Sequence, residues 1–220
     1  MSYRSFSITP TLRYYPERFR SCNVYVWSLG ERNVLFDPSL APEHVADAGP
    51  IDLLIATHAH FDHIGQLMTW KARDPAPPYW MHAGDLGMLM DPKANASAFF
   101  GRSMTFPTPD RKLADGEHIV LDDLHAMDVM NTPGHTHGSS CFLLHEDDRP
   151  MAMITGDTLF DMGWGRTDFV TGDDALMRQS LERLYRVLSD LPPELPVCAG
   201  HGAMTTARQS CRFLERMGFA

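Results

Sequence analysis

Cysteine is scarce in this 220-residue sequence, which has four cysteines and no C-x-x-C pair. Cys22, Cys141, Cys198 and Cys211 stand among apolar neighbours, which favours buried thiols over disulfides or thiolate ligands. Residues 1–10 lack the apolar stretch of a secretory signal peptide, and no apolar run approaches the length that crosses a bilayer. We therefore expect a cytoplasmic protein with no membrane partner.

Positive charge is also in short supply, with 19 Lys and Arg residues against 28 Asp and Glu residues and a net charge of −9. An acidic surface without a run of basic residues repels phosphate backbones, so we do not expect nucleic acid as a partner. The sequence has no G-x-S-x-G motif either, so nothing predicts a serine nucleophile. The 11 His residues, in contrast, are many for this length, and their clustering indicates a metal site.

Hydrophobic patterns predict several strands in one mixed α/β domain over residues 1–220. Hydrophobic residues make up 44 % of the sequence, which is enough for a substantial core. Two strands are expected to form a hairpin around the turn at Gly30. The expected strands are 22–29, 33–36, 51–56, 79–81, 118–121, 126–130, 140–145, 151–155 and 196–199.

Two helices are predicted towards the end of the chain. The first covers 173–188, where four apolar residues recur at helical spacing and predict a buried face: Met177, Leu181, Leu184 and Leu188. Thr171 or Asp173 would cap it. The second helix is expected at 206–217.

One loop carries four potential metal ligands within six residues, namely His58, His60, Asp62 and His63. These residues directly follow the apolar strand expected at 51–56, and α/β proteins place their chemistry at such strand ends. Imidazole and carboxylate groups suit zinc, iron or manganese, and the absence of cysteine argues against a structural tetrahedral zinc. The loop therefore predicts a metal site.

Three further predicted strand ends present a possible ligand: His135, Asp157 and His201. Small residues beside them let the backbone approach a shared centre closely. Four such coincidences favour a common metal centre over unrelated surface histidines. The histidines outside this context are expected at the surface: His44, His82, His118, His125 and His145.

The H-x-H-x-D-H motif of residues 58–63, with the later His135, Asp157 and His201, resembles the metallo-β-lactamase superfamily. The resemblance implies an αββα sandwich in which two β-sheets pack face to face with helices outside. It also implies two divalent metal ions, zinc in the first place, with iron or manganese as alternatives. The implied ligands are His58, His60 and His135 for the first ion, Asp62, His63 and His201 for the second, and Asp157 between the two.

Two aspartates would support this chemistry. Asp37 matches the family's strand-end aspartate, which accepts the second ring N–H of a metal-binding histidine and fixes its orientation. The alternative for Asp37 is a plain turn with Pro38. A metal pair makes hydroxide available at neutral pH, so no side-chain nucleophile is needed. Asp62 would act as the catalytic carboxylate that orients this hydroxide or takes up its proton.

The segment 156–169 resembles the glyoxalase II group and the related persulfide dioxygenases, and compact single-domain glyoxalase II-like (hydroxyacylglutathione hydrolase-like) proteins match best. Asp157 separates the chain from true β-lactamases, which lack this bridging carboxylate. The resemblance implies that Arg166 binds the glutathione portion of a substrate, since its guanidinium fits a carboxylate; the alternative is an ion pair with Asp168. Phe160 and Trp164 would flank the substrate.

The expected function is hydrolysis of a thioester, such as an acylated glutathione. Full-length glyoxalase II enzymes complete their glutathione site with a C-terminal domain and a tyrosine shortly after the last ligand histidine. This sequence matches neither feature, so we expect its glutathione recognition to be weaker or built differently. A persulfide dioxygenase with one iron on His58, His135 and Asp157 is an alternative, although Trp164 replaces that group's usual cysteine. A lactonase is another, although Phe160 stands where a tyrosine is expected. The remaining alternative is a non-enzymatic metal-binding or redox partner module.

Overall fold

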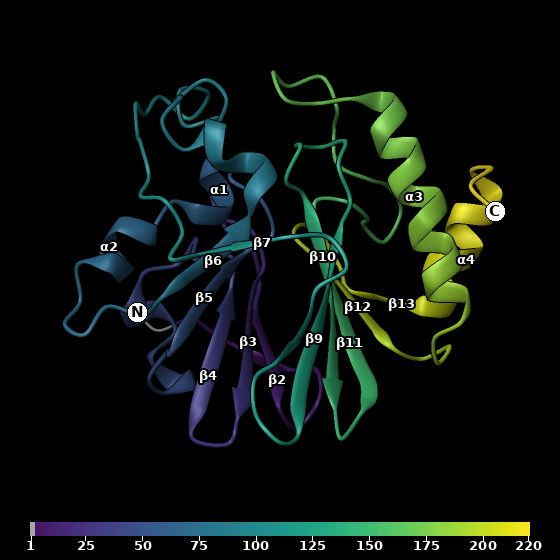
Figure 1. Ribbon diagram of the computed structural model, residues 1–220, viewed down its shortest axis with the longest axis horizontal. Helices are drawn as coiled ribbons and strands as arrows, with labels where there is room; N and C mark the ends of the chain where they lie inside the picture. The colour runs from purple at the N-terminus through teal and green to yellow at the C-terminus, as the bar shows by residue number, and fades with distance from the viewer. Residues whose placement is uncertain (1–2) are drawn as a thin grey trace. The chain divides into compact units, whose positions relative to one another are not determined.

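The computed structural model describes residues 3–220 (Figure 1), so the first two residues of the segment 1–10 lie outside the description. The chain divides into two compact units, Met1–Leu113 and Ala114–Ala220. The single domain over residues 1–220 stays a prediction.

Within residues 3–113, seven strands form one mixed sheet in the order β1-β2-β3-β4-β5-β6-β7. The strands are β1 (Phe6–Ser7), β2 (Leu12–Tyr15), β3 (Val24–Leu29), β4 (Arg32–Phe36), β5 (Leu53–Ala56), β6 (Tyr79–His82) and β7 (Arg111–Leu113). The helices are α1 (Phe61–Ile64), α2 (Leu67–Lys71) and the 3-10 turns η1 (Pro42–His44), η2 (Ala46–Ala48) and η3 (Ala83–Met88). The strands β4 to β7 pair in parallel, so their carboxyl ends meet at one edge.

The apolar patterns account for the centre of this sheet. The predicted hairpin is confirmed, with Leu29 opposite Arg32 and the turn residue Gly30 at a φ of +72°. The predicted strand at 51–56 is confirmed as β5, all four residues of which are buried. The helices α1 and α2 add Ile64, Leu67 and Trp70 to the core of this unit.

In residues 114–220, a six-stranded sheet has the order β13-β12-β11-β10-β9-β8. The strands are β8 (His118–Val120), β9 (His125–Asn131), β10 (Ser140–Glu146), β11 (Arg149–Gly156), β12 (Pro196–Ala199) and β13 (Thr205–Thr206). The strand β10 pairs antiparallel with both β9 and β11, and β11 pairs parallel with β12. The carboxyl ends of β9, β11 and β12 therefore lie at the same edge of this sheet.

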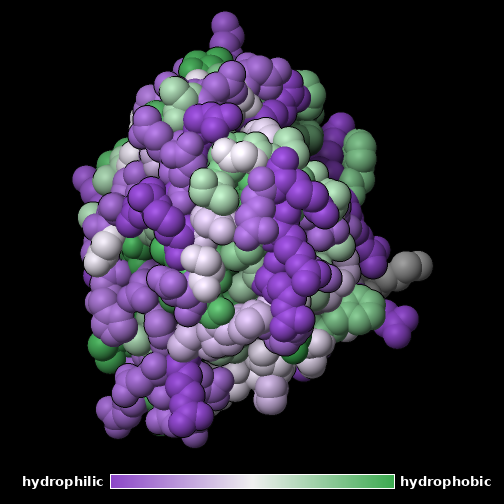
Figure 2. Space-filling view, turned by 90° about the vertical axis from the view of Figure 1, so that its right-hand side faces the viewer, coloured by the Kyte–Doolittle hydropathy of each residue, from purple (hydrophilic) through white to green (hydrophobic). Residues whose placement is uncertain are grey.

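Both predicted helices are confirmed as α3 (Asp174–Ser189) and α4 (Ala207–Arg216). Asp173 caps α3 by accepting a hydrogen bond from the Leu176 N–H, and Thr206 caps α4 in the same way. The four predicted apolar residues of α3 are all buried, in one cluster with residues of β10, β11, β12 and α4. Figure 2 faces the side of Figure 1 that carries α3 and α4, and the surface there is predominantly hydrophilic. The helices are thus amphipathic, as their spacing predicts.

The cysteines are free thiols, three of them buried and Cys211 partly buried, which confirms the interpretation of the sequence. The expectation of a surface position is wrong for His125, which is 6 % exposed and lies 2.7 Å from the Asp122 carboxylate. Among the described residues, none of the helices combines the length and the apolar character that a bilayer span requires.

Candidate metal centre

The first unit presents its histidines on the connection between β5 and α1. His58 and His60 lie on the loop, and His63 lies in α1 together with Asp62. The three histidines are at most 2 % exposed, while Asp62 is half-buried. The start of α1 is fixed by the Phe61 N–H, which donates to the Asn95 carbonyl over 2.8 Å. The loop is therefore held on both sides, by β5 and by the segment that contains Asn95.

Asp37 anchors this loop from the neighbouring strand end. It follows β4 in a left-handed conformation, with a φ of +60°, which is uncommon for a residue other than glycine. Its carboxylate accepts hydrogen bonds from the Thr57 N–H (2.7 Å), the Thr57 hydroxyl (3.0 Å) and His63 Nδ1 (2.9 Å). Since an ionised carboxylate only accepts, His63 carries its proton on Nδ1, and Nε2 is the basic nitrogen suited to a metal. The structure thus places Asp37 against His63.

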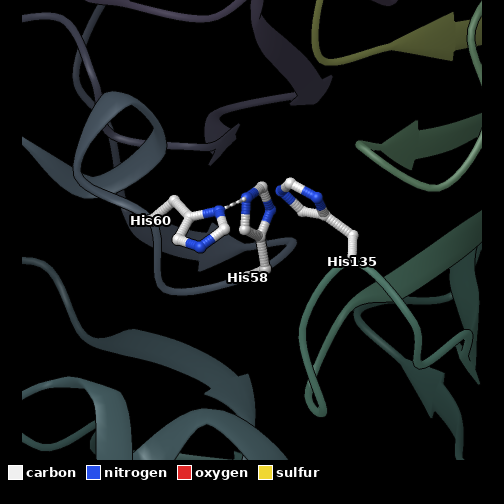
Figure 3. Close-up of side chains that lie close together, drawn as sticks. All are labelled: His58, His60 and His135. Atoms are coloured by element: carbon white, nitrogen blue, oxygen red, sulfur yellow. Dashed lines mark hydrogen bonds between the residues drawn. The ribbon is translucent and has the colours of Figure 1, made fainter. Parts of the chain in front are cut away.

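Thr57 orients His58 in the same way. Its hydroxyl donates to Asp37, so its oxygen accepts from His58 Nδ1 over 3.1 Å. The basic nitrogen of His58 is then Nε2, which lies 3.1 Å from Nδ1 of His60 (Figure 3). Two nitrogens bound to one zinc ion are separated by about 3.0–3.5 Å, given bonds of 2.0–2.1 Å. The spacing of these two rings therefore suits a common ion.

Asp85 also holds the histidine loop, although the sequence interpretation missed it. It is fully buried in η3, and its Oδ2 accepts a hydrogen bond of 2.9 Å from the N–H of Ala59, between His58 and His60. A signal was available, because Asp85 follows the strand β6, which is parallel to β5. The strand-end argument used for the other ligands, applied to β6, would have found it.

The second unit brings its three predicted ligands together at the shared edge of β9, β11 and β12. Asp157 follows β11, and its Oδ2 lies 3.5 Å from Nε2 of His135 and 3.7 Å from Nε2 of His201. Both distances exceed an ordinary hydrogen bond and approach the separation of donors around one ion. His135 is 3 % exposed and Asp157 is 8 % exposed. Two imidazoles and one carboxylate therefore converge on one point.

The backbone around Arg166 sets the orientation of His135, which is also drawn in Figure 3. His135 Nδ1 donates to the Arg166 carbonyl over 2.7 Å, so the basic nitrogen is Nε2, the atom that faces Asp157. Gly165 permits this approach. A Cβ on Gly165 would lie 2.0 Å from the Asp157 carbonyl oxygen and 3.0 Å from the His135 ring, so a side chain has no room there.

The three residues expected near the substrate have different surroundings. The Arg166 guanidinium makes a two-pronged ion pair with Asp168, both contacts being 2.6 Å, which is the alternative raised by the sequence. Trp164 packs its ring against Phe213 and Phe219, in the hydrophobic core of the second unit. Phe160 lies beside His201, with ring centroids 6.3 Å apart.

Mixed β-sheets with helices, and buried imidazole and carboxylate groups at their strand ends, are typical of an α/β metal-binding protein. The model of the Metallo-beta-lactamase superfamily matches residues 18–216. The chain belongs to this superfamily, and the predicted metallo-β-lactamase fold is confirmed.

Three similar proteins illustrate the relationship. The hydroxyacylglutathione hydrolase GloC of Haemophilus influenzae is 29 % identical over 199 residues, which cover 88 % of this chain and 90 % of its own. The crystal structure of the B3 metallo-beta-lactamase BLEG-1 has a TM-score of 0.77 at 28 % identity, over 94 % of this chain and 99 % of its own. The di-iron-bound form of TTHA1623 has a TM-score of 0.68 at 30 % identity, over 87 % and 93 %.

Proposed function

We propose that this protein is a metal-dependent hydrolase of thioesters, with acylated glutathione as one candidate substrate. The observation that carries the proposal is the arrangement at Asp157, where Nε2 of His135 and Nε2 of His201 face one carboxylate oxygen at 3.5 and 3.7 Å. A site that holds imidazoles in their metal-binding tautomer is built for an ion rather than for a side-chain nucleophile. The similarity to GloC supports a thioester as substrate.

The seven donors are assigned as the family resemblance implies. His58, His60 and His135 would hold one ion, Asp62, His63 and His201 the other, and Asp157 both. When bound, the ion pair supplies hydroxide at neutral pH and polarises the substrate carbonyl. Asp37 and Thr57 keep the basic nitrogens of His63 and His58 turned towards the ions. Asp62, half-buried in α1, would orient the hydroxide or take up its proton.

Zinc is the proposed metal, with iron and manganese as alternatives, since the donor set has no sulfur. The di-iron form of TTHA1623 supports iron as a real alternative. The cytoplasm as location and small molecules as partners, without nucleic acid or membrane, remain predictions from the sequence.

Metal content and thioester turnover, measured on the same preparation, test the proposal. We expect about two metal ions per chain and metal-dependent hydrolysis of S-lactoylglutathione or a simpler thioester. Asp157→Asn and His135→Ala should lose at least about 100-fold in kcat/KM together with bound metal. His118→Ala is a matched control, since its ring contacts Asp128 on the β8–β9 pair and none of the seven donors is involved.

Other outcomes would point elsewhere. One iron per chain with oxygen uptake on glutathione persulfide would establish the dioxygenase alternative, and turnover of lactones alone would establish the lactonase. A folded protein that takes up no metal would refute the proposal that the chain is a metal-dependent hydrolase.

A further inference from the structure

A depression of about 320 Å³ lies next to His201, entirely within the second unit. Its walls are the segments 160–163 and 201–203. The first segment is a tight turn, closed by a 2.8 Å hydrogen bond from the Phe160 N–H to the Gly163 carbonyl. Phe160 lines the depression beside the His201 ring, with ring centroids 6.3 Å apart, and Met162 also lines it and is 69 % exposed. A proposed metal ligand thus borders a small, mainly apolar hollow.

The side chains around this depression offer no cationic partner to an anionic ligand. No Lys or Arg is among its lining residues, and its acidic residue is Asp161. The nearby Arg166 is engaged by both oxygens of Asp168. Away from the metal ions themselves, a substrate carboxylate would therefore meet the like charge of Asp161 and no available guanidinium. An uncharged aliphatic chain would cover Phe160 and Met162.

We infer that this depression is the acyl-chain subsite of the hydrolase, and that it selects an uncharged, short to medium aliphatic acyl group. The inference rests on the proposed function, because the acyl carbon must reach the metal that His201 would hold. The volume stands at the lower end of the range for small-molecule sites, about 300–1,000 Å³. Recognition would then be concentrated on the acyl group rather than on the carboxylates of a glutathione leaving group.

The chain-length dependence of kcat/KM tests this inference in the metal-loaded enzyme. The substrates are N-acetylcysteamine thioesters from acetyl to hexanoyl, whose leaving group carries no carboxylate. Burial of apolar surface gains about twofold to fourfold per methylene group, so hexanoyl should exceed acetyl at least tenfold. Met162→Glu should bring this ratio close to one. Met90→Glu changes an equally exposed methionine of the first unit, at 70 % exposure, and should keep the ratio and the rates.

A binding measurement separates the subsite from the chemistry. In protein labelled with ¹³C at the methionine methyl groups, titration with hexanamide should shift the Met162 resonance saturably, and acetamide should not. Thioester turnover with a flat chain-length profile, or an unchanged ratio in Met162→Glu, would overturn the subsite and leave the proposed function standing. Absence of any thioester turnover would refute the proposed function. In that case a saturable shift of the Met162 resonance with hexanamide would still support an aliphatic binding site, and no shift would overturn it.

Discussion

Asp85 offers a sharp test of how the histidine loop is held. In the variant Asp85→Leu, the Ala59 N–H loses its acceptor between two proposed metal ligands, while Asp85→Asn keeps an oxygen that can accept the same hydrogen bond. Asparagine is close to aspartate in size, and leucine has the same branching at Cγ but is bulkier. A buried N–H left without an acceptor costs about 1–3 kcal/mol, and removal of a buried carboxylate offsets part of this penalty. Both variants should therefore fold.

The expected effect falls mainly on metal affinity. Groups that support metal ligands typically change the affinity by about 10–100-fold when they are removed, which corresponds to about 1.4–2.7 kcal/mol. We expect Asp85→Leu to weaken metal binding within this range and Asp85→Asn to stay within about threefold of the wild type. Competition against a chromophoric chelator measures the affinity, and urea unfolding of the metal-free proteins measures the stability.

A matched control comes from Asp52, whose carboxylate accepts a 2.9 Å hydrogen bond from the Asn33 N–H elsewhere in the same unit. Asp52→Leu should lower the free energy of unfolding without changing metal affinity. Wild-type affinity in Asp85→Leu would refute the positioning role. An equal loss in Asp85→Asn would show that the negative charge matters rather than the hydrogen bond.

Three further predictions concern single contacts. Asp37→Ala removes three hydrogen bonds from the loop and should lower the metal content towards one ion per chain, as elemental analysis would show; an unchanged content would contradict it. Gly165→Ala places a Cβ 2.0 Å from the Asp157 carbonyl oxygen, so unfolding should become easier by about 1–3 kcal/mol and kcat/KM should fall, unlike in Gly87→Ala, where the Cβ meets nothing within 4 Å. The hydrogen bond from Lys71 lowers the pKa of Asp110. Because this pKa is lower in the folded than in the unfolded chain, the ionised carboxylate stabilises the fold fully above the ordinary aspartate pKa of about 3.9. The stabilisation is lost as the pH falls through the folded-state pKa. The stability difference between wild type and Asp110→Asn should thus shrink between pH 5 and pH 3 in urea titrations, and a constant difference would contradict this.

The sequence predicted the elements that apolar patterns determine. Buried strands such as β5 and β12, and the amphipathic helix α3, have patterns that few other structures would satisfy. The elements that were missed are short. Neither β1, with both residues exposed, nor the four-residue helix α1 carries a pattern of its own. Such a helix is too short to be stable alone, and tertiary contacts such as that of Asn95 fix it.

In the candidate site, too, some residues could be predicted from the sequence and others could not. The seven donors could be predicted because histidines and aspartates that can bind a metal stand directly after recognisable strands. Thr57 could not, because its importance arises from buried hydrogen bonds that only the folded chain reveals. Asp85 was missed because it stands alone after the strand β6, although the strand-end argument extends to it. The sequence thus predicts the metal donors, whereas the hydrogen-bonding groups that orient them become evident only in the folded structure.

Arg166 shows that a backbone group can matter where the sequence draws attention to a side chain. The sequence leaves its guanidinium between a substrate carboxylate and Asp168; in the structure the guanidinium is exposed and paired with Asp168, and the backbone carbonyl orients His135. The same stretch supplies Asp157 as a donor, the turn at Met162 as a wall and Gly165 as the point of close approach. This one segment supplies a metal donor, a wall of the acyl subsite and the carbonyl that orients His135. A change in its backbone should therefore alter metal binding and acyl selectivity together. A change in the Arg166 side chain alone leaves the carbonyl that faces His135 in place.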